Sequence, residues 1–173
     1  MFRRLLARWG RRQVETPGLV FARPLWDEMV AELGRRGLDG GRESGAFLLA
    51  PHDGDGKRVT RAIYLDDLDS NCLVGGIHFH GCGYSKLATM CEREQLRVVG
   101  DVHTHPGSWV GQSDVDRDNP MLALRGHLAV IMPDYSTRPI EPREVGIHEY
   151  RGEDGWNSSL GSDAARLLQI EGS

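Results

Sequence analysis

Long hydrophobic runs are what this sequence most clearly lacks. No apolar stretch approaches the ~20 residues that a helix needs to span a bilayer, so we expect no membrane-spanning segment. An excess of basic residues is also missing, because 21 Lys and Arg stand against 25 Asp and Glu, for a net charge of -4. That balance gives no electrostatic reason for nucleic-acid binding. The two shortages favour a cytoplasmic protein whose partners are neither membranes nor nucleic acids.

Cysteine is scarce as well. Cys72, Cys82 and Cys91 are an odd number at irregular spacing, which suits neither a disulfide framework nor a Cys-x-x-Cys metal site. We therefore expect free thiols in a reducing compartment, with Cys91 on the apolar face of a helix. A cysteine nucleophile is the minor interpretation.

The length and the patterning indicate one folded domain. The chain has 173 residues, of which 39% are hydrophobic. Short apolar or β-branched runs predict strands near residues 19–22, 45–50, 58–65, 96–103, 128–132 and 145–150. Helices are expected at 24–36 and 84–93, and a polar, glycine-rich loop at 66–82. This alternation predicts an α/β (α+β) fold with a single mixed β-sheet flanked by helices.

The two ends differ from this central domain, which we place at residues 17–151. Residues 1–16 contain five arginines among Phe2, Leu5, Leu6 and Trp9, a spacing that predicts a basic amphipathic helix. We favour a frayed or domain-packed terminus over docking to an acidic partner or an anionic membrane surface. Residues 152–173 are rich in Gly, Ser and Asp and predict a tail with a short helix at 163–169.

The most informative motif begins with His103-Thr104-His105-Pro106 and continues with Ser-x-x-Asp at Ser113 and Asp116. Residues 97–102 predict a buried strand, and alternation along that strand puts both imidazoles on one face. Pro106 ends regular pairing because it has no amide proton, and Ser113 suits a helix N-cap. The chain thus returns a carboxylate to the two histidines.

These residues predict a zinc site. His103, His105 and Asp116 supply three nitrogen or oxygen ligands, which leaves tetrahedral zinc one open position for water. An open position is typical of catalytic rather than structural zinc, which lowers the pKa of its water and polarises a carbonyl. The predicted chemistry is amide-bond hydrolysis without a covalent intermediate.

Neither half of the motif is specific by itself. Ser-x-x-Asp resembles an ordinary capping pattern, and His78-Phe79-His80 repeats His-x-His without a Ser-x-x-Asp at the right distance. We expect that second pair to be structural or substrate-facing. The proton acceptor is assigned to Glu43, at the mouth of the strand predicted at 45–50. Without the zinc motif, a solvated loop glutamate would be the simpler interpretation of that residue.

Glu43 followed by Ser-Gly-Ala-Phe-Leu-Leu, together with His-x-His-Pro-x6-Ser-x-x-Asp, resembles the JAMM (MPN-plus, JAB domain) zinc metalloprotease family. The resemblance covers roughly residues 19–150. It implies the JAB/MPN architecture, which is cytidine-deaminase-like. It also implies Glu43 as general acid and base, Ser113 as a donor to the oxyanion, and, as zinc ligands, His103, His105 and Asp116.

The same resemblance implies an activity and a partner. Family members hydrolyse isopeptide or peptide bonds after the C-terminus of ubiquitin or a ubiquitin-like protein, in deconjugation or in precursor maturation. The small size, the basic N-terminus and the sequence Asp-Val-His-Thr-His-Pro are similar to bacterial members, some of which accompany ubiquitin-like conjugation enzymes in antiphage operons. The expected partner is a ubiquitin-like protein or its conjugates.

Substrate-binding residues are expected in two segments. The loop at 66–84 contributes His80 and Tyr84, and the loop between the metal ligands contributes Trp109, which lacks an obvious core. Three acidic residues of the first segment suit an arginine-bearing tail ahead of a C-terminal Gly-Gly, or are solvated loop charges: Asp66, Asp67 and Asp69.

Three other functions are compatible with parts of the pattern. One is a JAMM-like peptidase that acts on small peptides or on an amino acid attached to a sulfur-carrier protein. Another is a DNA-repair-associated relative, which the acidic pI does not support. The third is a non-catalytic scaffold that binds ubiquitin-like proteins, and the intact ligand set and Glu43 conflict with it.

Overall fold

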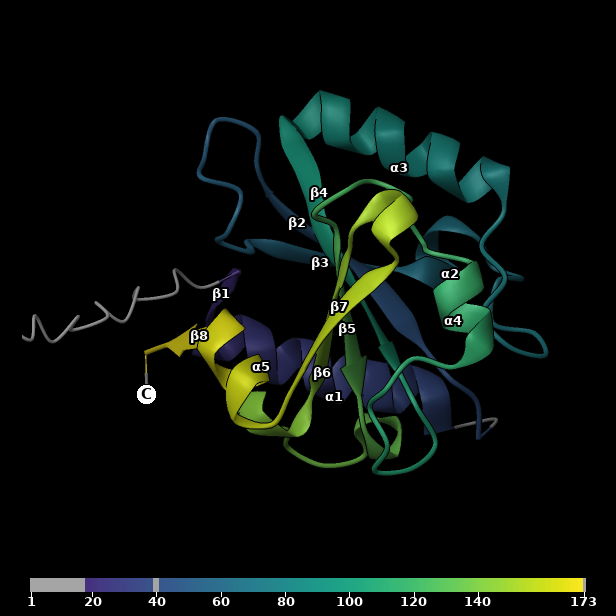
Figure 1. Ribbon diagram of the computed structural model, residues 1–173. Coiled ribbons are helices and arrows are strands. Elements are labelled where there is room, and N and C mark those ends of the chain that lie inside the picture. Colours follow the sequence, from purple (N-terminus) through teal and green to yellow (C-terminus); the bar gives the residue numbers. More distant parts are fainter. Residues whose placement is uncertain (1–17, 39–40, 173) are drawn as a thin grey trace, which may run out of the picture.

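A mixed six-stranded sheet forms the centre of the molecule in the computed structural model, which describes residues 18–38 and 41–172 (Figure 1). The strand order is β3-β2-β4-β5-β6-β7. In chain order the strands are β2 (Gly45–Pro51), β3 (Arg61–Tyr64), β4 (Leu96–Thr104), β5 (Leu128–Met132), β6 (Gly146–Tyr150) and β7 (Trp156–Leu160). β4 and β5 run parallel, and the other neighbouring pairs run antiparallel. The predicted mixed sheet flanked by helices is confirmed.

Helices cover both faces of this sheet. α1 (Arg23–Leu38) packs on one face, and α3 (Gly81–Glu94) with the short α2 (Leu65–Leu68) packs on the other (Figure 1). Alternation along β2 explains the division, because Leu48 joins the core on the α1 side and Phe47 joins the core on the α3 side. β2 is therefore buried on both faces and is apolar throughout.

The segment after residue 151 is more structured than the predicted tail. It contains β7, the edge strand of the sheet, then α5 (Ser162–Leu167) and β8 (Leu168–Glu171). β8 pairs in parallel with β1 (Leu19–Ala22) in a separate two-stranded sheet. Of the predicted helix at 163–169, the structure has a helix that ends at Leu167, after which β8 begins. The remaining residues form strands in place of the predicted tail, because polar serines in β7 hide the strand pattern. The helix predicted in residues 1–16 lies outside the described residues.

Smaller differences concern the helix boundaries. The predicted loop at 66–82 is interrupted by α2, and α3 begins at Gly81, three residues before the predicted Tyr84. Short 3-10 turns at Asp134–Ser136, Pro142–Glu144 and Gly152–Asp154 connect the later strands. In the described part of the chain, no helix combines the length and the apolar composition that a membrane span requires.

The cysteines lie around α3. Cys72 is buried before the helix, Cys82 is exposed in its first turn, and Cys91 is half-buried near its end. Burial raises the pKa of the Cys72 thiol to about 12, and burial also raises the pKa of Cys91. A raised pKa disfavours the thiolate, so neither of these two groups has the properties of an activated nucleophile.

Candidate metal centre

The three predicted ligands meet at the end of β4. His103 is the penultimate residue of that strand, and His105 follows the strand on the same face. The Nε2 atoms of the two imidazoles lie 3.1 Å apart. The Asp116 carboxylate lies 3.5 Å from His103 Nε2 and 3.4 Å from His105 Nε2. His103, His105 and Asp116 thus form a compact group whose ligand atoms lie within 4.8 Å of one another.

This triangle fits the metal that the motif predicts. Ligand bonds of 2.0–2.1 Å in a tetrahedral zinc site place neighbouring ligand atoms about 3.3 Å apart. The two imidazole nitrogens lie 3.1 Å apart, close to that value, and each faces a different oxygen of Asp116, with Oδ1 3.5 Å from His103 Nε2 and Oδ2 3.4 Å from His105 Nε2. Two imidazoles and a carboxylate are also a donor set that zinc uses in catalytic sites. The group can therefore hold a divalent ion without rearrangement of the backbone.

A short helix delivers the carboxylate. α4 (Asp114–Asp118) begins after Ser113, whose hydroxyl accepts a hydrogen bond from Asp116 N at 3.1 Å. In return, the Asp116 carboxylate accepts from Ser113 N and from Ser113 Oγ, both at 2.7 Å. The Ser-x-x-Asp pattern is thus a capping box, and the same box aims Asp116 at the histidines. Ser113 as an oxyanion donor stays a prediction.

A backbone carbonyl orients His105. The ring Nδ1 lies 3.2 Å from Trp109 O, and a carbonyl can only accept, so Nδ1 carries a proton and Nε2 is the atom that faces the ligand triangle. The Trp109 ring stacks on the imidazole at a centroid distance of 5.5 Å and lies over Gly111. Residues 106–112, here called the metal loop, thus fold back on the ligand that precedes them.

A strained turn holds the start of the metal loop. Asp134, Tyr135 and Ser136 have left-handed φ values of 53°, 52° and 55°. Such a conformation costs roughly 1–2 kcal/mol per residue other than glycine, so the surroundings must impose it. Tyr135 N donates to His105 O at 2.8 Å, and Ser136 O lies where a Cβ on Gly34 of α1 would come within 2.4 Å. The turn therefore ties the ligand backbone to α1.

The electrostatics of the site favour a cation. Burial alone would lower the pKa of His103, yet the Asp116 carboxylate, assisted by Asp101 and Glu43, holds that pKa above its ordinary value. Burial would raise the pKa of Asp116, but hydrogen bonds from His103 and His105 keep it well below its usual range. The negative charges of Asp116, Asp101 and Glu43 around His103 thus favour a positive charge at this place, either a proton on the imidazole or a metal ion.

A cavity of about 320 Å³ opens beside the ligands and is also lined by Glu43. Glu43 comes from the loop between α1 and β2, so the predicted base and two of the predicted metal ligands, His103 and Asp116, line one space from different elements. Among the described residues that line this space, none is Lys or Arg. Asp101, two residues before His103 in β4, is a further carboxylate in the cavity wall. Its Oδ1 lies 2.5 Å from Nε2 of the buried His127.

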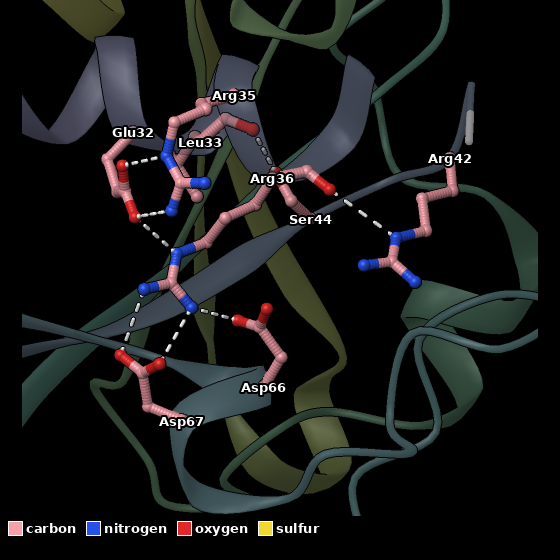
Figure 2. A network of polar contacts seen from close by, with 8 residues as sticks. All are labelled: Glu32, Leu33, Arg35, Arg36, Arg42, Ser44, Asp66 and Asp67. Carbon is pink, nitrogen blue, oxygen red and sulfur yellow. Dashed lines mark hydrogen bonds and ion pairs between the residues drawn. The ribbon is translucent and has the colours of Figure 1, made fainter. Parts of the chain in front are cut away.

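The loop that carries Glu43 is anchored on both sides of that residue (Figure 2). Ser44 Oγ donates to Leu33 O at 2.8 Å, and Ser44 N donates to Thr104 Oγ1 at 3.0 Å, directly beside His103. On the other side, Arg42 Nε donates to the carbonyl of Arg36 at 3.4 Å. The backbone at Glu43 is therefore fixed both to α1 and to the strand that carries the histidines.

Arg36 extends this anchor to the wall of the cavity. Its guanidinium binds Glu32 on its own helix, and Asp66 at 2.5 Å and Asp67 at 2.9 Å on α2 (Figure 2). The same guanidinium lies over the Tyr64 ring. α2 also contributes a cavity-lining leucine. Asp66 and Asp67 are thus engaged within the protein, which favours a structural role over the capture of an arginine-bearing tail.

The predicted substrate-binding residues lie at two places, Trp109 in the metal loop and His80 with Tyr84 at the start of α3. Trp109 is 59% exposed at the metal loop. His80 pairs with Asp69 at 2.6 Å at the start of α3, and Tyr84 donates to Met121 O at 2.7 Å among aromatic rings. None of these three lines the cavity, although His78 of the same His-x-His does. Their role in substrate binding stays a prediction.

Sequence reasoning missed two residues around the centre. Trp156 of β7 lines the cavity, and its Nε1 donates at 3.1 Å to the carbonyl of Arg117 in α4. His148 of β6 is buried beneath the metal loop and hydrogen-bonds to Val110 O at 2.9 Å. In the sequence, Trp156 stands in the predicted tail and His148 in a predicted strand. Neither residue has a spacing that connects it to the motif, so sequence reasoning had no ground for assigning it to the site.

No protein-family model matches the chain. Among solved structures, it is similar to a protein from Desulfitobacterium hafniense, with a TM-score of 0.62 and 18% identity over 90% of this chain and 94% of that one. A protein from Salinibacter ruber gives a TM-score of 0.55 and 16% identity over 82% and 88%. A JAB1/MPN domain protein from Archaeoglobus fulgidus matches at 13% identity over 90% and 99%, with a TM-score of 0.46, too low to establish a shared fold. At these identities the likeness to the first two proteins shows a common fold and no common chemistry.

Proposed function

We propose that this protein is a zinc-dependent hydrolase of the JAMM type that cleaves an amide bond. The observation that carries the proposal is the triangle of His103, His105 and Asp116 on one side of a cavity that Glu43 also lines. Each member of the motif is present, and hydrogen bonds orient two of the ligands, His105 through Trp109 O and Asp116 through Ser113. A non-catalytic scaffold would not need this arrangement.

The roles follow from the chemistry of amide hydrolysis. His103, His105 and Asp116 would hold zinc, which would supply a Lewis acid for the scissile carbonyl and lower the pKa of water. Glu43 accepts the proton of the attacking water and delivers it to the nitrogen of the leaving amine. Asp116 keeps its negative charge because its pKa is depressed, and His105 keeps its lone pair toward the metal because Trp109 O binds Nδ1–H.

The substrate that we propose is the C-terminus of a ubiquitin-like protein, joined to another chain by an isopeptide or peptide bond. The motif resemblance supports this substrate class, and the exposed Trp109 beside the centre offers a surface for a protein partner. A bacterial ubiquitin-like conjugation system in the cytoplasm, including one used against phage, is the setting that we propose.

The decisive test measures cleavage of a ubiquitin-like protein that carries a C-terminal extension. Wild-type protein loaded with zinc should cleave after the terminal glycine, and removal of the metal by a chelator should abolish the activity. Glu43→Gln should lower kcat by about 10²–10⁴-fold, the usual contribution of a general acid–base group, while the zinc content stays at the wild-type level. Glu28→Gln, an exposed glutamate of α1, is the matched control and should be fully active.

Other outcomes would redirect the proposal. Full turnover by Glu43→Gln would exclude this residue as the base. Zinc-loaded wild type that cleaves short peptides or a sulfur-carrier adduct, but no ubiquitin-like fusion, would favour the small-substrate peptidase. Tight binding of the ubiquitin-like protein without any hydrolysis would favour the scaffold.

A further inference from the structure

A row of side chains crosses the sheet beneath the metal loop. His148 of β6 lies opposite Ser158 of β7 in the antiparallel register, and neighbours across a sheet share a face. The same register links His148 through Ala129 to Asp101 of β4, which lines the cavity. His148 is 1% exposed. A buried imidazole therefore sits on the same sheet face as the candidate ligands, two strands away from them.

The hydrogen bonds of His148 have one consistent set of directions. Its Nε2 lies 2.9 Å from Val110 O, and a carbonyl can only accept, so Nε2 carries the proton. Its Nδ1 lies 2.8 Å from Ser158 Oγ and must then accept the hydroxyl proton. Burial lowers the pKa of His148, which keeps the ring in this neutral form. The ring is thus fully used as one donor and one acceptor.

The metal loop approaches β6 closely at this point. A Cβ on Gly146 would come within 2.0 Å of Val110 O and 2.7 Å of the His148 Nε2 atom, so a side chain at residue 146 cannot fit. Gly146 pairs with Ile131 of β5, and Ile131 pairs with His103 of β4, so the three residues lie in one row across the sheet. The absence of a side chain lets the loop settle onto the sheet beside the first metal ligand.

Two consecutive carbonyls of the loop then have fixed partners. Trp109 O accepts from His105 Nδ1, and Val110 O accepts from His148 Nε2. The two peptide groups that flank the Val110 Cα atom are thus each held by an imidazole, so the orientation of Trp109 O, the acceptor for His105, is coupled to His148 through one residue of backbone. This series of hydrogen bonds begins at Ser158 on the edge strand and ends at Nδ1 of His105.

We propose that His148 is a positioning residue for the metal centre: it fixes the metal loop so that Trp109 O holds His105 in its ligating orientation. The proposal rests on the proposed function only in requiring that the ligand triangle binds a metal. Loss of an outer-shell partner of a ligating histidine typically weakens metal binding by about 10–100-fold. We expect a loss in that range when the donor to Val110 O is removed.

Two amide substitutions of His148 distinguish the effect of losing the hydrogen-bond donor to Val110 O from the effect of losing the bulk of the ring. In His148→Gln the side-chain nitrogen can reach the position of Nε2 and donate to Val110 O. In His148→Asn the shorter amide reaches only the position of Nδ1 and keeps contact with Ser158 alone. His148→Leu removes both bonds at similar volume, and Ser158→Ala removes only the bond to Nδ1. His52→Leu, at an exposed histidine of the β2–β3 hairpin, controls for the loss of an imidazole.

The measurement is metal affinity, by competition between the protein and a chelating dye for zinc, together with the visible absorption spectrum of the cobalt-substituted protein. His148→Asn and His148→Leu should bind zinc about 10–100-fold more weakly and alter the cobalt spectrum. His148→Gln should remain within a few-fold of wild type, Ser158→Ala should fall between, and His52→Leu should be unchanged. Should the leucine variant fail to fold, the Gln and Asn pair still decides.

Equal zinc affinities and equal cobalt spectra for wild type, His148→Gln and His148→Asn would overturn the proposal, whatever the melting temperatures. Wild type that binds neither ion would contradict the metal centre and this role together. Wild type that binds zinc but cleaves no substrate would contradict the proposed hydrolase, and the affinities of the variants would still decide the role of His148.

Discussion

Trp109 is the large apolar residue that the metal loop exposes to solvent. Its ring packs on His105 from one side, and 59% of the residue remains accessible. Val115 of α4, which lines the cavity, and Val74 of the loop before α3 are 64% and 68% exposed. Large apolar side chains that stay exposed beside a cavity are typical of binding surfaces. The exposed face of the Trp109 ring is thus available to a protein substrate.

We expect Trp109→Ala to raise KM for a ubiquitin-like fusion substrate by about tenfold, because exposed aromatic residues often carry more than 1 kcal/mol of binding energy. The zinc content should not change, since the group that holds His105 is the backbone carbonyl of residue 109. Trp109→Phe keeps an aromatic face and should lie close to wild type. Unchanged KM and kcat for the alanine variant would exclude Trp109 from substrate binding.

Glu32 provides a pH-dependent contribution at the junction of α1 and α2. Hydrogen bonds from Arg35 and then Arg36 lower the pKa of Glu32 from 4.5 to about 2. A depressed carboxyl pKa stabilises the folded state above the unfolded pKa, and this stabilisation is lost as the pH falls toward the folded value. The side chain is partly exposed, so we expect Glu32→Gln to cost at most about 1 kcal/mol at pH 7.

Urea unfolding of wild type and Glu32→Gln at pH 7, 5 and 3 measures this contribution. The difference in unfolding free energy should be largest at pH 7 and should shrink between pH 5 and pH 3. Glu28→Gln, on the same helix, should show no such trend. A difference that is constant across the pH range would mean that the ion pairs contribute nothing through ionisation.

Single residues of the site were predictable where a local pattern carried them. The alternation of β4 and the capping box of α4 place His103, His105 and Asp116, and both patterns span only a few residues. His148 acts on Val110 from 38 positions away in the chain, a pairing set by strand register. No local spacing encodes such a register, so the supporting residues could not be predicted.

At the scale of elements, β7 is where prediction and structure differ most. Its sequence Trp-Asn-Ser-Ser-Leu has neither the β-branched residues nor the alternation that indicate a strand. Hydrogen-bonded pairing with β6, and not its own sequence pattern, makes this segment a strand. The strands around the motif were predicted correctly because β2 and β5 are continuous apolar runs and β4 contains the β-branched residues Val98, Val99 and Val102. An edge strand with one polar face gives a weaker signal, although it supports α4 through Trp156.

A chain that ends at residue 151 tests this role. We expect it to lose zinc binding and to unfold or aggregate, because it lacks the partner of β6, the partner of β1 and the Trp156 contact to α4. Circular dichroism and zinc content measure the two effects. The point variant Trp156→Phe, which keeps the ring and loses the bond to Arg117 O, should fold. A truncated chain that keeps zinc and its fold would show that these residues are dispensable.

At the scale of the whole molecule, the site combines elements from both halves of the chain. The proposed base comes from the α1–β2 loop, the proposed ligands come from β4, from the residue after β4 and from α4, and β7 contributes to the cavity wall. The layered fold was predictable because alternating apolar runs and helical spacings each specify one layer. The meeting of these elements at one end of β4 was predictable only through the motif.

The basic segment at residues 1–16 contributes none of the assigned ligands. We therefore expect its deletion to leave zinc content and amide hydrolysis at wild-type levels, as measured by metal analysis and by the cleavage assay. A truncated protein that loses zinc would show that the segment supports the centre. A protein that keeps zinc but loses only the protein substrate would assign the segment to substrate recruitment.

The parallel pairing of β1 with β8 has a mechanical consequence. The chain enters β1 at Leu19 and leaves β8 at Glu171, which lie at opposite ends of the paired ribbon. Tension between these two points loads the ribbon in shear, so its hydrogen bonds resist together instead of opening one after another. A molecular motor that pulls on either end of the folded domain would meet this ribbon first, and the metal centre would stay intact until the ribbon gave way.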